Sequence, residues 1–358
     1  MNKKMPTMEC GKVAILFTEW SQDSVDNPNL GVSNDLLPIC GKHMLQRVIE
    51  KIVDSGFLTI HVLLTNSSGE VRDFLGSGER WGCSIQYHQN HPQSLLREKL
   101  KTLTLADDDH YLVANSHTLP ILKKSFYEPG NNHQGKVAVH GNEKAIAWTG
   151  WGIFRGDWLM AQQTVAQLHE NAMDESSPKA RCLTHEPYTV ITLADLVNTS
   201  RRILNESNAN NEGNYIHISR GSKLHDSVQL VAPVFIGRHV KVSANTIIGP
   251  NVVIGDGAYI DKGAHLTNSI VMPDTYIGEI LELKQVVVRG KSLANIQLNT
   301  VIEVSDSHLL SVVSDVLAQG PWEYRFTYLF DLIGNVFRFG KQKYGTDKTL
   351  KSAEVVWD

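Results

Sequence analysis

The sequence has few cysteines, no long apolar run and no export signal. Four cysteines occur in 358 residues, without the CxxC pairing of zinc and redox sites, and we expect scattered reduced thiols at Cys10, Cys40, Cys83 and Cys182. No stretch of about 18 uninterrupted apolar residues occurs, so no membrane span is predicted. The apolar stretch near the start, residues 13–17, is short and precedes no small-residue cleavage site. These absences predict a cytoplasmic protein.

The chain also lacks a basic run. Lys and Arg total 34 against 38 Asp and Glu, which gives a formal net charge of -4. A protein that wraps a phosphate backbone needs a concentrated positive surface, so this balance argues against a nucleic-acid partner. Hydrophobic residues make up 42% of the chain, enough at this length to bury two cores. We therefore expect a folded protein of two domains.

The first half alternates between β-rich runs and segments with helical periodicity. Residues 59–65, TIHVLLT, are apolar and β-branched, as expected for a strand buried on both faces. Apolar residues recur at three- and four-residue steps in 44–53, and Gly56 follows as a predicted C-terminal cap. The predicted strands are 12–17, 59–65, 83–88 and 110–115, and the predicted helices are 44–53, 69–75 and 94–103. This order predicts a mostly parallel sheet with helices on both sides.

The second half has a period of six residues. From residue 234 it reads VFIGRH, VKVSAN, TIIGPN, VVIGDG, AYIDKG, AHLTNS, IVMPDT. The third place of every six is apolar: Ile236, Val242, Ile248, Ile254, Ile260, Leu266 and Met272. Such a repeat predicts short flat strands that stack in successive coils of a parallel β-helix. We expect about two coils, with a slip of register after Tyr276.

Two polar passages separate the halves. Residues 169–182 are predicted to form a surface loop and residues 205–214 a linker, because neither passage has enough apolar surface to hold a fixed shape. We therefore divide the chain into an α/β domain over 1–214, a β-helix domain over 215–319 and a tail over 320–358. The tail places Trp322, Phe326, Phe330 and Phe337 on one helical face, between basic residues. This face suits packing on the β-helix, or docking on a membrane surface or a protein.

The order of the two domains resembles that of sugar-1-phosphate nucleotidylyltransferases, the NDP-sugar pyrophosphorylases that include mannose-1-phosphate guanylyltransferases. The resemblance covers residues 11 to 275. It is most specific in SNDLLPICGKHML (33–45), which matches the family pattern PKxLLPVxGKPML. The resemblance implies a nucleotidyltransferase-like, mostly parallel sheet flanked by helices, followed by a short left-handed β-helix. It also implies a sugar nucleotide or sugar phosphate as ligand, and a homo-oligomer.

The residues that carry the family's chemistry are replaced in this sequence. The family's glycine-rich phosphate loop corresponds to TEWSQDSVDNPN (18–29), which has no glycine or arginine. A backbone that approaches phosphate closely needs glycine there. Ser33 stands at the family's proline and Asn34 at its phosphate-binding lysine. Ser94 replaces a glycine of the segment that approaches base and sugar.

The two metal aspartates of the family also have no counterpart. The motif NGD, whose aspartate ligates magnesium, corresponds to Asn115, Ser116 and His117, and the second metal aspartate aligns with Thr189. Magnesium prefers hard oxygen ligands, so a histidine is a poor exchange. The resemblance therefore implies a catalytically degenerate protein with a regulatory or scaffold role, without confidently assigned catalytic or metal residues. Its ligand pocket would comprise Asn34, Ser94, Asn115, His117, Gly150 and Thr189.

Two other enzymatic hypotheses stay open. An active pyrophosphorylase would need magnesium as its cofactor. A hexapeptide acyltransferase would use a histidine of the repeats, His239 or His265, as general base. The run Asp107, Asp108, Asp109 resembles a metal cluster, but its position just before a strand favours a solvated turn.

Overall fold

The computed structural model describes nine stretches of the chain: residues 12–18, 36–64, 68–89, 96–128, 135–142, 145–174, 180–298, 300–319 and 355–356. Its contacts divide the chain into two compact units. The first consists mainly of Lys42–Thr192, and the second of Leu193–Asp358 together with Pro38–Gly41. Asn34, Ser94 and the tail from 320 to 354 lie outside the described residues.

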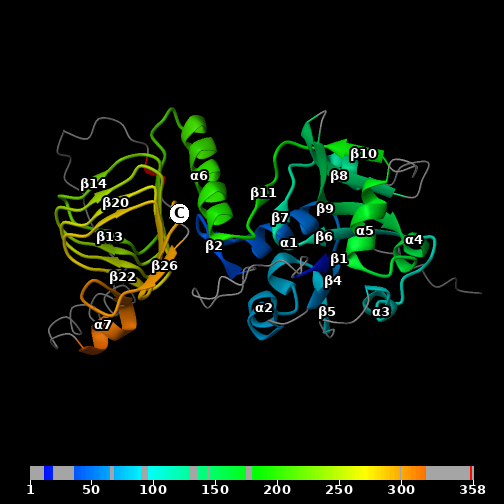
Figure 1. Cartoon of the computed structure of the whole chain (residues 1–358), viewed down its shortest axis with the longest axis horizontal. Coiled ribbons are helices and arrows are strands. Elements are labelled where there is room, and N and C mark those ends of the chain that lie inside the picture. Colours follow the sequence, from blue (N-terminus) through cyan, green and yellow to red (C-terminus); the bar gives the residue numbers. More distant parts are fainter. Residues whose placement is uncertain are drawn as a thin grey trace, which may run out of the picture. The chain divides into compact units, whose positions relative to one another are not determined.

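The first unit is built on a seven-stranded sheet with the order β10-β8-β9-β6-β1-β4-β5 (Figure 1). Strands β6, β1, β4 and β5 run parallel, and β9 runs antiparallel to both β6 and β8. The bounds are β1 Val13–Phe17, β4 Thr59–Leu64, β5 Ser84–Gln89, β6 His110–Asn115, β8 Gly135–Asn142, β9 Ala145–Arg155 and β10 Ala180–Leu183. The four strands predicted from sequence are thus confirmed, and they form the parallel part of the sheet.

Helices cover both faces of this sheet. α1 (Met44–Asp54) and α2 (Ser68–Leu75) pack on one face with Ile60 and Val62 of β4. α3 (Leu96–Lys101), α4 (Gly156–Met160) and α5 (Val165–Met173) pack on the other, around Ile15 and Phe154. Gly56 has a φ of +87° directly after α1 and its N–H donates to the Val53 carbonyl, which confirms the predicted cap. No described helix is both long and apolar enough to cross a membrane.

Short elements complete the first unit. These are β3 (Lys42–His43), η2 (Glu79–Trp81), β7 (Thr118–Leu119), η3 (Lys124–Tyr127) and β11 (Tyr188–Thr189). The surface loop predicted over 169–182 is wrong at both ends, because α5 continues to Met173 and β10 begins at Ala180. The buried side chains of Leu168 and Ala172 anchor α5, so the polar residues between them occupy its exposed side.

The second unit begins with β2 (Pro38–Ile39) and α6 (Leu193–Asn210). The linker predicted over 205–214 is therefore wrong for its first six residues, which belong to α6. Polar composition misled the prediction, since α6 buries Leu196, Val197 and Leu204 while its polar C-terminal residues Asn205 and Glu206 are exposed. By contacts α6 belongs with the second unit, whereas the sequence placed the domain boundary near residue 215.

The rest of the second unit is a parallel β-helix of four coils, not two. Its first column contains β12 (Ile216–Ile218), β15 (Val234–Ile236), β18 (Val252–Ile254), β21 (Ile270–Val271) and β24 (Val286–Arg289). The second contains β13 (Lys223–Leu224), β16 (Lys241–Val242), β19 (Tyr259–Ile260) and β22 (Thr275–Ile277). The third contains β14 (Gln229–Leu230), β17 (Ile247–Ile248), β20 (His265–Thr267) and β23 (Glu282–Lys284). The first coil, 216–230, was missed because no glycine follows its apolar residues Ile218, Leu224 and Leu230.

The coil register slips earlier than predicted. Ile236 pairs with Ile254, 18 residues later, but Ile254 pairs with Val271, only 17 residues later. The connection between β20 and β21 is one residue shorter than the repeat requires. Val271, rather than Met272, therefore lies in the internal apolar column. The later pairings keep the shorter spacing, for example Ile260 with Ile277. The slip predicted after Tyr276 is therefore wrong in position.

Additional strands border the β-helix. β25 (Ser292–Asn295) and β26 (Thr300–Glu303) continue the first column as antiparallel strands from β24. β27 (Leu310–Val312) pairs antiparallel with β22 and leads into α7 (Val313–Gln319). β28 (Val355–Val356) pairs with β12 at the opposite edge of the same sheet. The fold class predicted from sequence, an α/β sheet followed by a β-helix, is confirmed.

Candidate functional site

The candidate site lies at the carboxyl ends of β1 and β6, where parallel α/β sheets generally bind ligands. Phe17 and Asn115 are register partners at the ends of these two strands. Beyond them, Ser116 N–H donates to the Phe17 carbonyl at 3.0 Å, and the Thr18 hydroxyl donates to the Leu63 carbonyl at 3.1 Å. Thr18, Asn115 and Ser116 are buried. The chain therefore places a row of neutral polar groups across the two strand ends.

Asn115 holds this edge together through both ends of its amide. Its Oδ1 accepts the Thr118 N–H at 2.8 Å and its Nδ2 donates to the Thr149 carbonyl at 3.2 Å. Gly150 follows with a φ of +80°, and a Cβ at this position would collide with the Asn115 amide. Two residues predicted from sequence, Asn115 and Gly150, thus pack against each other, and glycine is required for that approach.

His117 and Thr189 lie beside this pair. The His117 carbonyl accepts the Val190 N–H at 2.9 Å, and Thr118 of β7 pairs with Thr189 of β11. The Trp151 indole N–H donates to the Thr118 carbonyl at 2.6 Å, which secures β7 from the side of β9. Four of the six predicted pocket residues, namely Asn115, His117, Gly150 and Thr189, are therefore brought together around β7.

Ser116 is a site residue that the sequence reasoning did not select. Its side chain is fully buried, and its hydroxyl has no hydrogen-bond partner among the residues that the structure describes. An unsatisfied buried hydroxyl costs about 1–3 kcal/mol, so it marks a place where a ligand would supply a partner. The signal was present in the sequence, because Ser116 occupies the middle place of the family's NGD motif.

Among the residues that the structure describes, the side chains that converge at this edge offer amide, hydroxyl and imidazole groups and no carboxylate. In the described part of the chain, no group of three or more His, Cys, Asp or Glu residues is placed to hold a metal ion. Magnesium takes oxygen ligands in octahedral geometry and is usually held by carboxylates, so these residues fit it poorly. They suit hydrogen bonding to an uncharged, hydroxyl-rich group.

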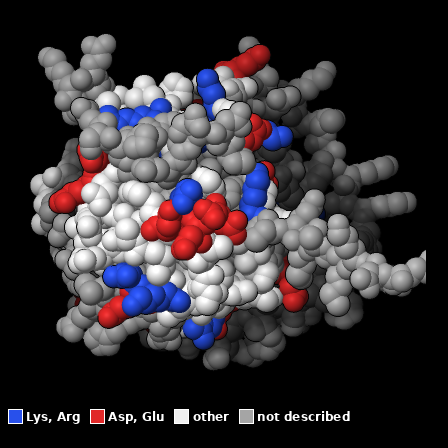
Figure 2. Space-filling view, turned by 90° about the vertical axis from the view of Figure 1, so that its right-hand side faces the viewer, with Lys and Arg blue, Asp and Glu red and all other residues white. Residues whose placement is uncertain are grey.

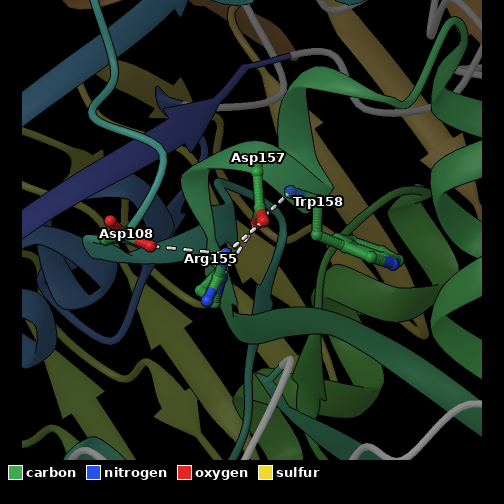
Figure 3. Close-up of polar contacts among 4 residues, drawn as sticks. All are labelled: Asp108, Arg155, Asp157 and Trp158. Atoms are coloured by element: carbon green, nitrogen blue, oxygen red, sulfur yellow. Dashed lines mark hydrogen bonds and ion pairs between the residues drawn. The ribbon is translucent and has the colours of Figure 1, made fainter.

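The three consecutive aspartates form a turn, as predicted. Asp157 and Gly156 donate their N–H groups to the carbonyls of Asp107 and Asp109, at 3.1 and 3.0 Å. Arg155 pairs with Asp108 at 3.4 Å and donates through Nε to Asp157 at 3.0 Å (Figure 3). The hydrogen bond from Arg155 lowers the pKa of Asp157, against the opposing effect of its slight desolvation.

The face of the molecule seen in Figure 2 mixes acidic and basic groups. Lys and Arg side chains lie between Asp and Glu side chains there, and they form no single positive field. This distribution agrees with the near balance of charge in the sequence, 34 basic against 38 acidic residues.

The positions of SNDLLPICGKHML that agree with the family pattern are structural. Gly41, with a φ of +78°, packs against Phe235 of the β-helix, and the Cys40 thiol lies 3.8 Å from the Ser200 carbonyl of α6. Lys42 pairs with Glu50 of α1 at 3.0 Å. Partial burial opposes ionisation of Glu50, but hydrogen bonds from Gln46 and Lys42 outweigh it and lower its pKa.

Comparison with known proteins supports the resemblance in the second unit. Residues 230–313 match the family model described as the GMPPB C-terminal domain. A solved structure provisionally assigned as a glucose-1-phosphate thymidylyltransferase from Bacillus anthracis, in complex with a sucrose, is 13% identical. Its TM-score is 0.44, and the match covers 52% of this chain and 94% of that chain, a likeness too low to decide anything. No curated protein matches.

Proposed function

We propose, on the premise that this chain is sugar-1-phosphate nucleotidylyltransferase-like, that its first unit binds a sugar nucleotide or sugar phosphate without nucleotidyl transfer. One observation carries the proposal. Where the resemblance implies a metal-binding carboxylate, the chain has His117, which follows Asn115 and Ser116 at the end of β6 and whose carbonyl accepts the Val190 N–H. An imidazole at this position offers magnesium no hard oxygen ligand.

The physical reason is the charge of the reaction. Nucleotidyl transfer moves a phosphoryl group whose negative charge must be neutralised by a metal ion and cationic side chains. A neutral amide, a hydroxyl and an imidazole at the strand ends do not hold magnesium well. Binding without turnover does not need this neutralisation of charge, because hydroxyl and amide groups hydrogen-bond a sugar ring whether or not a metal ion is present. The buried Ser116 hydroxyl supplies one such unused group.

The test is calorimetric titration of the full chain with a panel of sugar nucleotides and sugar phosphates, each with and without magnesium. Any ligand that binds is then assayed for pyrophosphate release with the matching nucleoside triphosphate and sugar 1-phosphate. We expect affinity that is unchanged by magnesium, and no release of pyrophosphate. Magnesium-dependent turnover would instead identify an active pyrophosphorylase and overturn the proposal.

A pair of glycine variants locates the ligand. Gly150→Ala places a methyl group against the Asn115 amide, so ligand affinity should fall at least tenfold. Gly82→Ala has a similar φ of +71° but no atom within 4 Å of the new Cβ, and it should leave affinity unchanged. Equal affinities of the two variants would place the ligand away from the end of β6.

The acyltransferase alternative is not favoured by the β-helix. His239 lies in the turn between β15 and β16, with a φ of +54°, whereas His265 lies in β20 of a different column. The two histidines therefore do not form one site. The homo-oligomer, the cytoplasmic location and a docking role for the tail remain part of the proposal. Analytical ultracentrifugation of the full chain and of a version that ends at residue 319 tests the homo-oligomer and the docking role of the tail.

A further inference from the structure

We propose that His61 and His88 form a binding site for a divalent transition metal, on the opposite face of the sheet from α1. His61 Nδ1 and His88 Nε2 are 2.9 Å apart, and the two rings are 5.0 Å apart at a tilt of 50°. Both side chains are partly buried. The pair lies on β4 and β5, and His88 is level in register with Phe17 and Asn115 but two strands from β1.

The strand register explains why these nitrogens converge. His61 pairs with Gln86, and Leu63 pairs with His88, so the two histidines are diagonal neighbours on adjacent parallel strands. Side chains two residues apart along a strand point to the same face, which is the face covered by α3. Because β5 is the edge strand of the seven-stranded sheet, the pair stands at the border of that face.

Thr102 orients the second histidine. The Thr102 hydroxyl donates to the Lys99 carbonyl at 2.7 Å, and its oxygen lies 3.4 Å from His88 Nδ1. Since the hydroxyl proton is already used, this oxygen can accept a proton from His88 Nδ1, and Nε2 then carries the lone pair. Metal-binding histidines are generally held in this way through their other ring nitrogen. The lone pair of His88 Nε2 therefore faces His61.

Electrostatics keeps both rings in the neutral form that binds metals. Burial lowers the pKa of His88, and burial together with the nearby charge of His88 lowers the pKa of His61. The metal ligand is neutral imidazole. In the metal-free pair His61 Nδ1 holds the proton that it shares with His88 Nε2, so a metal ion takes the place of this proton and His61 then carries its proton on Nε2.

The nitrogen spacing favours some metals over others. With metal–nitrogen bonds of about 2.0–2.1 Å, two ligands at right angles are about 2.9 Å apart, whereas a tetrahedral zinc needs about 3.3–3.4 Å. The observed 2.9 Å between His61 Nδ1 and His88 Nε2 thus suits neighbouring positions of a square-planar copper(II) or nickel(II) ion. No further His, Cys, Asp or Glu of the described chain completes a cluster of three, which leaves the other positions to water or a small ligand.

The test is titration of the full chain with nickel(II), zinc(II) and magnesium(II), and an electron paramagnetic resonance spectrum of one equivalent of copper(II). We expect one nickel site per chain, weaker zinc binding, no magnesium binding, and copper hyperfine splitting from two imidazole nitrogens. His61→Gln and His88→Gln should each lower nickel affinity at least tenfold. Thr102→Val should lower it a few-fold, because the tautomer is no longer held.

His140→Gln is the matched control, because His140 is a partly buried histidine on β8 of the same sheet. It should bind nickel as the unchanged protein does, and circular dichroism confirms that each variant is folded. Three results would overturn the proposal: no nickel site in the unchanged protein, full affinity in folded His61→Gln, or an equal loss in His140→Gln. In each case the pair is simply a hydrogen bond between two histidines.

Discussion

Replacing Gly41 with alanine should lower the free energy of unfolding of the second unit. Gly41 has a φ of +78°, and a Cβ there would lie 2.5 Å from Cζ and 3.2 Å from Cε1 of Phe235. The Phe235 ring is only 8% exposed and stacks on the His217 ring, at 4.8 Å between centroids and 2° between planes. The ring therefore has little room to move away.

The expected magnitude has two parts. A non-glycine residue in the left-handed region costs about 1–2 kcal/mol. Forcing an extra carbon into a packed site costs about 1–3 kcal/mol more. The free energy of unfolding should thus fall by roughly 2–5 kcal/mol in Gly41→Ala. Adding Phe235→Leu to this variant should recover part of the packing cost, because the smaller side chain leaves space for the methyl group.

Urea unfolding combined with hydrogen exchange of residues 216–289 measures this loss in the second unit. Gly213→Ala is the control, because Gly213 has a φ of +85° but no atom within 4 Å of the new Cβ. Gly213→Ala should lose only the stability that a non-glycine residue costs in the left-handed backbone conformation. If Gly41→Ala loses no more than Gly213→Ala, or if Phe235→Leu recovers nothing, the packing argument for this segment is wrong.

Three further predictions concern single positions. In Gly150→Ala the free energy of unfolding should fall by about 2–5 kcal/mol, because the methyl group meets the Asn115 amide; an unchanged melting temperature would contradict the contact. Ile280 is β-branched with a φ of +56° and is 77% exposed. Asparagine adopts this backbone conformation more readily, so Ile280→Asn should raise the free energy of unfolding in urea by about 1 kcal/mol. A lower free energy of unfolding would show that the isoleucine side chain is needed. Burial and the nearby Asp256 raise the pKa of Asp274. A raised folded pKa favours the protonated acid, so stability falls as the pH rises through it, and Asp274→Asn should stabilise at pH 7 but not at about pH 3; an equal gain at both pH values would exclude the electrostatic cause.

Local patterns predicted the longer strands and helices of the first unit up to residue 115, but not β8, β9, β10, α4 or α5. The helix at 44–53 was found because its apolar residues recur with helical spacing, and the structure buries Leu45, Val48, Ile49 and Ile52 of α1. The strand at 110–115 was found at its observed bounds, since its side chains are apolar on both faces. Composition misled where a polar stretch belongs to an amphipathic element, as at the end of α6. A polar residue can lie on the outer side of a helix as readily as in a loop.

The β-helix shows where a repeat pattern stops being sufficient. Six-residue spacing identified the architecture, but it assigned Met272 to the internal column, which contains Val271. Both residues are buried, at 1% exposure, so neither burial nor hydrophobicity distinguishes them. Only the pairing of Ile254 with Val271 shows that one residue is missing from a turn.

The sequence by itself determined β1, β4, β5 and β6, the α/β order and the hexapeptide repeat, because these depend on spacing between near neighbours in the chain. It also determined that the position where the resemblance implies a metal-binding carboxylate holds His117 instead. Tertiary structure alone decided that Asn115 engages Gly150 and that His61 approaches His88. These pairs are separated by 35 and 27 residues, and a contact over such distances depends on strand order and register, which no local pattern encodes.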